Sequence, residues 1–162
     1  MSVIVAGSTG LVGTSLVKAF KETGHEVVGI NRKVLDLNDL SATRNFVNKH
    51  KPEIIINAAA FVGGIAANQS HPVEFLKHNI QIQNNLMAAA FEIGVPKFVF
   101  LGSSCSYPKN APQPIKEEYL LTGPLEETNS AYAIAKIAGI ELLNSYRKEY
   151  GVKWISLMPT NL

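Results

Sequence analysis

The sequence predicts an α/β fold, a doubly wound parallel sheet with helices on both faces. Three observations support this prediction. Apolar runs of strand length alternate along the chain with longer segments of helical pattern. The runs are continuously apolar, which is typical of strands buried on both faces. A glycine-rich turn, Gly7 to Gly13, lies between the first apolar run and the first helical segment.

Each strand is expected where an apolar run is bounded by polar or turn residues. The expected strands span residues 3–6, 26–30, 53–57, 97–101 and 153–158. The pattern also allows a short additional strand at 33–35. Because helical segments separate the main strands, we expect them to run parallel.

The helices between these strands are bounded by start and stop signals. Gly24 and Gly151 follow helical patterns and favour the left-handed conformation that ends a helix. Asp39 and Ser130 are suitable N-caps, and Pro72 suits the first turn of a helix. The expected helices are 11–23, 40–50, 72–93 and 130–150.

Length and composition indicate one globular domain, residues 1–162, with 46% hydrophobic and 17% charged residues. A net charge of +2 is too small to predict nucleic acid or a charged membrane surface as a partner. No apolar stretch approaches the ~20 residues of a membrane span, and the N-terminus lacks the charged start of a signal peptide. A single cysteine cannot form an internal disulfide, so we expect a reducing, cytoplasmic location.

Gly7, Gly10 and Gly13 form a G-x-x-G-x-x-G turn between a strand and a helix, the context in which glycines indicate a dinucleotide site. The first glycine permits a tight turn, the second lets the backbone approach a pyrophosphate, and the third lets the helix pack close to the sheet. Backbone N–H groups and the positive end of the helix would hold the phosphates. The alternative is a tight turn without a ligand. The expected cofactor-binding residues of the turn are Gly7, Ser8, Thr9, Gly10, Leu11, Val12 and Gly13.

The residues after the second strand indicate which dinucleotide binds. NAD-binding proteins usually carry an acidic residue there, against the ribose 2′-hydroxyl, whereas this chain has Asn31, Arg32 and Lys33. Because a guanidinium can hold a 2′-phosphate through paired hydrogen bonds, we predict NADPH, with Arg32 as its main contact and Lys33 in support. The alternative is a pair of solvated surface charges. Asp36 and Leu37 are expected to border the adenine, or are structural residues at a strand end.

Tyr132 and Lys136 lie one turn apart on the last expected helix and therefore face the same way. A free tyrosine has a pKa of ~10, which a neighbouring ammonium and the positive nicotinamide ring are expected to lower, easing proton transfer to an alkoxide. Ser103 follows the fourth strand, at the sheet edge where α/β folds bind ligands, and opens a long irregular stretch expected to be functional. We predict that Ser103 and Tyr132 bind a carbonyl oxygen during its reduction and that Lys136 contacts the nicotinamide ribose. The alternative is an ordinary surface Y-x-x-x-K.

Longer strings extend these short motifs. They are Val62-Gly63-Gly64-Ile65 with Asn68, Gly102-Ser103-Ser104-Cys105 with Tyr107-Pro108-Lys109, Ala111-Pro112-Gln113-Pro114, Leu121-Thr122-Gly123-Pro124-Leu125-Glu126, Tyr132-Ala133-Ile134-Ala135-Lys136-Ile137-Ala138-Gly139 and Met158-Pro159-Thr160-Asn161-Leu162. In these strings, and over nearly its whole length, the sequence resembles the extended short-chain dehydrogenase/reductases that act on nucleotide sugars. The resemblance implies a Rossmann fold of the extended type, truncated here before the last strand and the substrate domain.

The same resemblance implies roles for further residues. Cys105, two residues after Ser103, would act as an acid or base in epimerisation; the alternative is a small buried hydrophobic residue. The implied cofactor contacts are Ala58, Ala59, Ala60 and Pro159, together with Tyr132 and Lys136. The implied substrate-binding residues are Val62, Gly63, Gly64, Ser104 and Asn161.

Within this family the sequence is most similar to enzymes that epimerise two carbons beside a 4-keto group and then reduce the ketone with NADPH, converting GDP-4-keto-6-deoxy-D-mannose to GDP-L-fucose. A GDP-sugar is therefore the implied substrate, and a homodimer through the helices 72–93 and 130–150 is the implied assembly. One alternative is another nucleotide-sugar epimerase or dehydratase, against which the missing acid after Ile30 argues. The other is a non-catalytic NADP-binding module, against which the retained Ser103, Tyr132 and Lys136 argue.

The sequence departs from the family's pattern at its end. The family's partner acid/base is a histidine beyond the tract at 158–162, and the four histidines here, His25, His50, His71 and His78, are interpreted as ordinary surface or partly buried residues. We expect an N-terminal part of a longer enzyme, able to bind NADPH weakly but not to turn over substrate. We also expect the strand at 153–158 to be an unpaired apolar edge that promotes aggregation.

Overall fold

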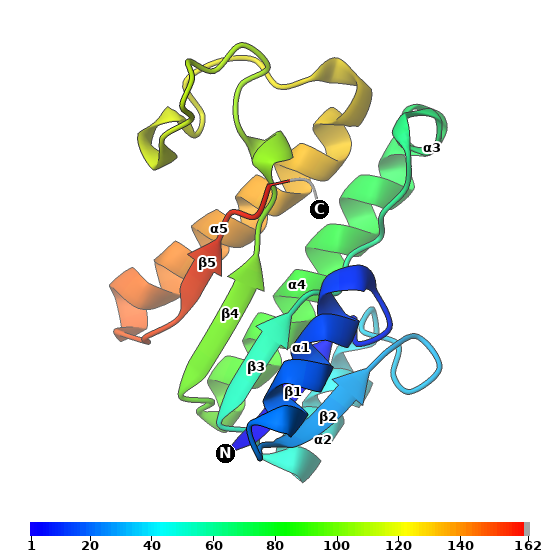
Figure 1. Cartoon of the computed structure of the whole chain (residues 1–162), viewed down its shortest axis with the longest axis vertical. Coiled ribbons are helices and arrows are strands. Elements are labelled where there is room, and N and C mark those ends of the chain that lie inside the picture. Colours follow the sequence, from blue (N-terminus) through cyan, green and yellow to red (C-terminus); the bar gives the residue numbers. More distant parts are fainter. Residues whose placement is uncertain (161–162) are drawn as a thin grey trace.

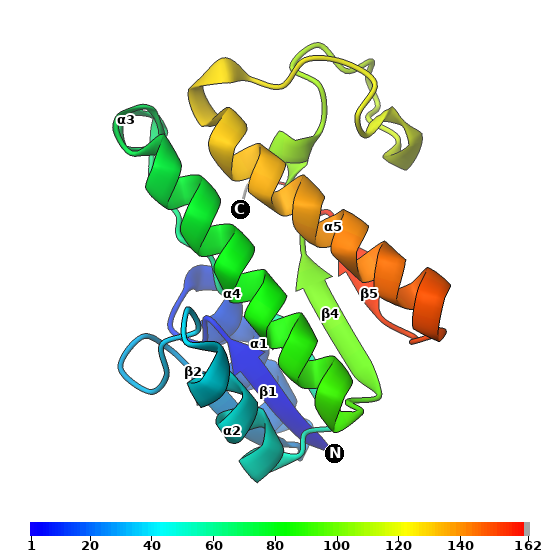
Figure 2. The same ribbon diagram turned by 180° about the vertical axis from the view of Figure 1, so that it is seen from behind.

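A computed structural model, which describes residues 1–160, has one parallel sheet between two helical layers. Figure 1 shows α1 (Leu11–Glu22) in front of the sheet, and Figure 2 shows α2 (Leu40–His50), α4 (Pro72–Ile93) and α5 (Ser130–Tyr150) across the opposite face. The predicted doubly wound α/β fold is confirmed. Within residues 1–160, none of the helices combines the length and the apolar run needed to cross a bilayer.

The five parallel strands lie in the order β2-β1-β3-β4-β5. Their bounds are Ser2–Ala6 for β1, Glu26–Ile30 for β2, Ile54–Asn57 for β3, Lys97–Leu101 for β4 and Ile155–Leu157 for β5. Because β1 pairs with both β2 and β3, the chain winds in opposite directions on its two sides. This switch point opens a crevice at the carboxyl ends of β1 and β3, the place where α/β sheets bind ligands.

Two sequence expectations fail at element boundaries. The additional strand at 33–35 is wrong, because the Asn31 side chain accepts hydrogen bonds from the N–H groups of Lys33 (2.9 Å) and Val34 (3.2 Å) and folds this segment into a turn. Ser130 as an N-cap is also wrong. It is the first residue of α5, and Asn129, the last residue of the 3₁₀ turn η3 (Glu127–Asn129), takes the cap position.

Other boundaries follow the predicted signals. The Asp39 side chain accepts a hydrogen bond of 2.9 Å from the Ala42 N–H and so caps α2. Gly24, just after α1, has a φ of +77°, and Gly151, which ends α5, has a φ of +71°. A short helix that no sequence signal predicted, α3 (Ile65–Ser70), precedes α4.

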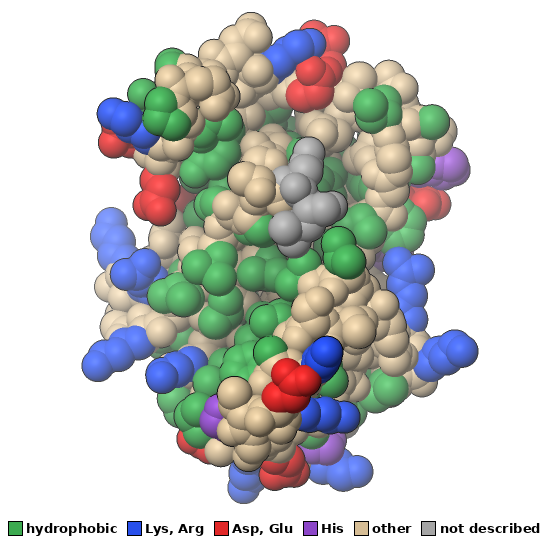
Figure 3. All heavy atoms as spheres, in the orientation of Figure 1, with side chains coloured by type: hydrophobic (Ala, Val, Ile, Leu, Met, Phe, Trp, Pro, Cys, Tyr) green, Lys and Arg blue, Asp and Glu red, His purple; other side chains and the backbone are tan. Residues whose placement is uncertain are grey.

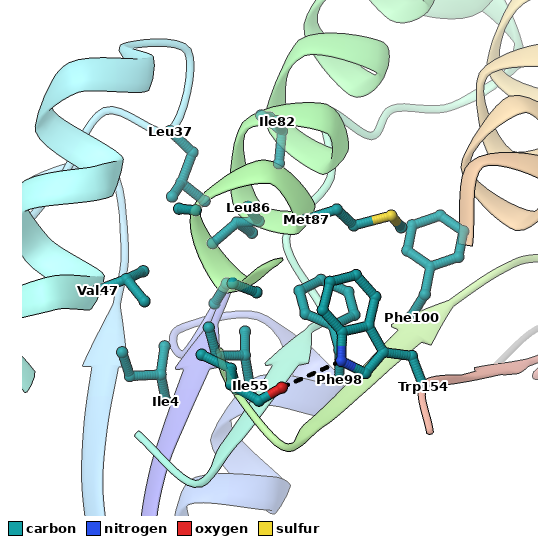
Figure 4. Close-up of a cluster of buried hydrophobic side chains, with 14 of the residues drawn as sticks. Ile4, Leu37, Val47, Ile55, Ile82, Leu86, Met87, Phe98, Phe100 and Trp154 are labelled. Atoms are coloured by element: carbon teal, nitrogen blue, oxygen red, sulfur yellow. Dashed lines mark hydrogen bonds between the residues drawn. The ribbon is translucent and has the colours of Figure 1, made fainter. Parts of the chain in front are cut away.

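The core lies mainly between the sheet and the α2–α4 layer. Figure 4 shows Ile4, Ile55 and Phe98 of the sheet facing Leu86 and Met87 of α4. In the same view the indole N–H of Trp154 donates to the backbone carbonyl of Val95 at 3.2 Å. A second, smaller cluster, Val3, Val5, Ile54 and Ile56, packs beneath α1. The apolar strands are therefore buried on both faces over the centre of the sheet.

The sheet is less well covered at β5. This strand pairs only with β4 among the described residues, and its Ile155 and Leu157 side chains are 46% and 47% exposed. Figure 3 shows hydrophobic side chains gathered over β4 and β5 on this face of the molecule. Residues 155–157 thus form an apolar edge of the described sheet, shorter than the predicted 153–158 because Trp154 is buried, and the aggregation stays a prediction.

Candidate active site

The glycine turn forms a tight cradle between β1 and α1. Gly7 has a φ of +81°, a conformation that favours glycine, and the N–H groups of Gly7 and Ser8 both donate to the Ile30 carbonyl at 2.9 Å. A Cβ on Gly13 would lie 2.0 Å from the Gly7 carbonyl oxygen, so only glycine lets α1 approach the turn this closely. A Cβ on Gly10 would meet the same oxygen at 3.4 Å, an ordinary contact.

A cavity of about 1050 Å³ opens beside this turn, at the switch point between β1 and β3. It is lined by most of the residues predicted for the cofactor, namely Gly7, Thr9, Gly10, Leu11, Val12, Gly13, Arg32, Lys33, Asp36, Leu37, Ala58, Ala59 and Ala60. Ser8 does not line it, since its hydroxyl donates to the Ile30 carbonyl at 3.1 Å. Val62, predicted for the substrate, lies at the cavity instead and is 69% exposed.

An aromatic and cationic wall that the sequence did not reveal closes one side of the cavity. The Arg32 guanidinium lies 5.3 Å from the centroid of the Phe61 ring, and His78 stacks against the same ring at 5.4 Å. The His78 Nδ1 and the Asn38 side-chain oxygen are 2.9 Å apart. His78 is partly buried, as expected, but the sequence interpretation missed its place in the cavity wall.

Residues at this wall lower the pKa of the Asp36 carboxyl group. Hydrogen bonds from the side chain and backbone of Asn38 hold the pKa of Asp36 below its ordinary value; burial opposes this, and the electrostatic effects of His78 and Arg32 add to the lowering.

Amide side chains on α4 fix the loops that build the cavity. Asn79 accepts a hydrogen bond from the Phe61 N–H at 2.8 Å and donates to the Phe61 carbonyl at 2.9 Å. Asn85 donates to the Leu37 carbonyl at 2.8 Å. Both asparagines are buried, and amides on the apolar face of a predicted helix are a signal that could have revealed them.

The predicted reacting residues gather at the next strand end. Ser103 follows β4, and the Lys136 ammonium donates to the carbonyl of Leu101, the last residue of β4, at 2.7 Å. Lys136 is only 4% exposed and lies 5.8 Å from the centroid of the Tyr132 ring. Because β3 and β4 are parallel neighbours, Ser103, Tyr132 and Lys136 lie at the same end of the sheet as the cavity, the end formed by the carboxyl termini of the strands.

The protonation of this group differs from the expectation. Burial raises the pKa of Tyr132 above its ordinary value, the charge of Cys105 raises it further, and a hydrogen bond with Ser103 offsets only part of this. Burial lowers the pKa of Lys136 to about 8. The Lys136 ammonium alone therefore does not lower the Tyr132 pKa as predicted, because desolvation of the phenolate dominates and the ammonium is directed at Leu101.

The segment after Ser103 places the remaining predicted residues. The Ser103 hydroxyl accepts a hydrogen bond from the Cys105 N–H at 3.3 Å, and the Ser104 N–H donates to the Pro159 carbonyl at 3.3 Å. The Cys105 sulfur accepts a hydrogen bond of 3.3 Å from the side chain of Asn129, a residue the sequence did not indicate.

Gly63 and Gly64 lie before α3, where Asn68 donates to their carbonyls at 3.0 and 3.2 Å. Asn161 lies outside the described residues.

Comparison with known proteins matches a family model described as the NAD dependent epimerase/dehydratase family to residues 3–162. Over 98% of its length the chain is 51% identical to a GDP-L-fucose synthase from Sinorhizobium fredii, and over 99% it is 50% identical to a putative GDP-L-fucose synthase 2 from Arabidopsis thaliana. It covers 50% and 49% of these proteins, so the chain spans about half the length of the curated relatives it matches.

A solved structure that resembles this chain also belongs to an enzyme of nucleotide sugars. The NADP-bound structure of MlghC, a GDP-mannoheptose C4 reductase from Campylobacter jejuni, has a TM-score of 0.94 and 38% identity, covering 99% of this chain and 51% of that one. The predicted resemblance to enzymes of nucleotide sugars is thus confirmed.

Proposed function

The chain belongs to the NAD dependent epimerase/dehydratase family, and from this premise we propose that it is the cofactor-binding and catalytic portion of an NADPH-dependent epimerase/reductase. The proposed reaction converts GDP-4-keto-6-deoxy-D-mannose to GDP-L-fucose; the product is the one in the names of its relatives, and the substrate is the one that the sequence resemblance implies. The observation that carries the proposal is the grouping of Ser103, Tyr132 and Lys136 at the end of β4, beside a cavity at the switch point.

The residues present fit NADPH. The cradle at Gly7 and Gly13 has no room for a Cβ, and backbone N–H groups at the start of α1 suit a pyrophosphate. Arg32 lies on the cavity wall after β2, where an acid would repel a 2′-phosphate and a guanidinium attracts it. Asp36, Leu37 and the alanines 58–60 would border the adenosine. When bound, the nicotinamide would supply the hydride that reduces the ketone.

The chain's own residues supply the protons. The raised pKa of Tyr132 keeps its phenol protonated near neutral pH, the state needed to donate a proton to the oxygen of a ketone as it becomes an alcohol. Ser103, which lies close enough to Tyr132 to affect its pKa, would hold that same oxygen. Cys105 would accept a proton from a carbon beside the ketone during epimerisation. Lys136 fixes the helix against β4 and would contact the nicotinamide ribose.

The proposed partners follow from the same family. The substrate is a GDP-sugar, bound near Val62, Gly63, Gly64, Ser104 and Asn161. The proposed assembly is a homodimer through α4 and α5, in which the exposed Ile80 and Ile134 would contact the second copy, whereas Leu86 belongs to the core.

The cofactor is tested by titrating NADPH and NADH into the 162-residue chain and following nicotinamide fluorescence. We expect NADPH to bind at least about tenfold more tightly, since a paired charged hydrogen bond is worth roughly 1.5–3 kcal/mol. The Arg32→Asp variant should lose this preference, and the Lys33→Asp variant, with the same change of charge, should lose less. Equal affinities for the two cofactors, or an Arg32→Asp variant that keeps the preference, would refute the assignment. GDP-L-fucose and UDP-glucose, added separately, test the substrate class.

A further inference from the structure

We propose that Asn129 is a positioning residue for Cys105, and that its side-chain N–H directs the sulfur into the site and favours the thiolate over the thiol. The inference rests on the proposed function, in which Cys105 exchanges a proton with the substrate. The observation behind it is the hydrogen bond of 3.3 Å from the Asn129 Nδ2 to the Cys105 Sγ.

Asn129 is at a position where its side chain would ordinarily cap a helix. It holds the N-cap position of α5, and asparagine is among the residues that cap helices best, because its side-chain oxygen accepts a hydrogen bond from the first turn. Here the side chain makes no capping hydrogen bond. The amide is directed at the sulfur instead, so the helix forgoes a cap worth about 1 kcal/mol.

The other end of the amide supports the same interpretation. The Asn129 side-chain oxygen is buried and has no hydrogen-bond partner in the described part of the chain. A buried unpaired acceptor costs about 1–3 kcal/mol. Since no partner of the oxygen orients the amide, the bond to Cys105 is the polar contact that does.

The charged groups around Cys105 are consistent with a role for Asn129 in stabilising the sulfur. Cys105 is half-buried and lies close enough to Tyr132 for its charge to raise the pKa of that phenol. Glu126, three residues before Asn129, is engaged by Lys109 at 3.0 Å and by the Thr128 N–H, and Glu127 is exposed. The Asn129 side-chain N–H donates to the sulfur, and hydrogen bonding to a charged form stabilises that form.

The proton transfer is balanced within the site. A proton leaves the carbon beside the ketone and bonds to the Cys105 thiolate, while the electron pair of the broken C–H bond moves into the enolate. The enolate oxygen accepts hydrogen bonds from Ser103 and Tyr132, which keeps its own proton because its pKa is raised. Return of this proton from the thiol to the same face restores the starting configuration, so inversion requires a proton delivered to the opposite face of the carbon. Asn129 makes the first step easier by stabilising the thiolate before the proton moves.

The test uses the fact that Cys105 is the only cysteine of the chain, so thiol alkylation and thiolate absorbance report on it alone. Iodoacetamide rates and ultraviolet absorbance are measured across pH for the wild-type chain, Asn129→Ala and Asn129→Asp. We expect the thiolate fraction near neutral pH to fall about tenfold in Asn129→Ala, as for loss of one charge-assisted hydrogen bond, and further in Asn129→Asp, which adds a negative charge. At high pH, where every variant is fully ionised, the rates should converge. The control is Asn144→Asp, the same change at an exposed position of α5, which should match the wild type.

Rates that match the wild type at every pH in both Asn129 variants would overturn the proposal. So would a loss that is equal at all pH values, since altered access alone gives that result. Circular dichroism identifies a variant that does not fold, and the remaining variant then decides. The assay needs neither cofactor nor substrate. A normal Asn129 effect with no NADPH binding would therefore refute the proposed function and leave this inference intact.

Discussion

Lys136 carries an ammonium in a place where a charge is costly. It is buried between β4 and α5, with its Nζ 4.9 Å from the Phe100 ring centroid and bonded to the Leu101 carbonyl. These contacts return only part of the lost hydration, so burial lowers the pKa to about 8. Burial of the Lys136 ammonium therefore costs stability near neutral pH, at a position proposed to contact the nicotinamide ribose.

This cost predicts how stability depends on pH. The folded-state pKa of Lys136, about 8, lies below its unfolded value of 10.5, so between these values the unfolded chain binds more protons. The free energy of unfolding of the wild type, relative to Lys136→Met, should therefore rise as pH increases from 8 to 10.5, by at most about 3 kcal/mol. Urea denaturation at a series of pH values measures it. Lys148→Met, at an exposed position of the same helix, is the control and should show no such trend.

Spacing alone predicted that Tyr132 and Lys136 share one side of a helix, because a four-residue separation fixes this geometry. It did not predict their protonation, which depends on desolvation by residues distant in sequence. Asn129 and His78 were missed for the same reason. Each acts through a tertiary neighbour, Cys105 or Phe61, that no local pattern identifies.

At the scale of elements, α4 organises the site through three buried amides. Asn79 holds the Phe61 backbone, Asn85 holds the Leu37 carbonyl, and Gln83 donates to the Ala135 carbonyl at 2.7 Å, which ties α4 to the helix that carries Tyr132 and Lys136. Buried amides bonded to backbone in this way fix one arrangement of the packed elements. One helix therefore positions both the cavity wall and the reacting group.

The glycine turn allows stability and binding to be separated. A Cβ at Gly13 would lie 2.0 Å from backbone oxygen, so Gly13→Ala should destabilise the fold by about 3 kcal/mol or more and abolish NADPH binding. A Cβ at Gly10 has room, so Gly10→Ala should cost less than about 1 kcal/mol yet weaken NADPH binding where a pyrophosphate would approach. Thermal denaturation and cofactor titration of both variants test this. Equal stability of the two variants would contradict it.

The elements themselves were largely predictable, since long apolar and amphipathic segments with caps carry most of the signal. The short elements were not. The helix α3 has only six residues, and the turn at 33–35 depends on the Asn31 side chain. The strand β5 is shorter than its apolar run because a strand extends only as far as its neighbour pairs with it, and β4 pairs with residues 155–157.

At the scale of the whole molecule, the cofactor cavity and the uncovered edge lie on different parts of the sheet. The cavity opens between β1 and β3, whereas Ile155 and Leu157 project from β5, with β4 between. An exposed apolar strand at a sheet edge favours association with other chains. Binding and association should therefore respond to different substitutions.

The double variant Ile155→Thr with Leu157→Thr tests this separation. Threonine keeps β propensity but removes apolar surface, so we expect the variant to self-associate less than the wild-type chain at equal concentration, by light scattering and sedimentation. Its NADPH affinity should stay within about twofold of the wild type, since β5 does not line the cavity. The control is Val34→Thr, which removes an exposed apolar side chain from the turn after β2, away from β5. A further variant, Ile80→Thr, tests the proposed contact through α4. If Ile80→Thr reduces association and the β5 variant does not, the association occurs through the helices and not through the sheet edge.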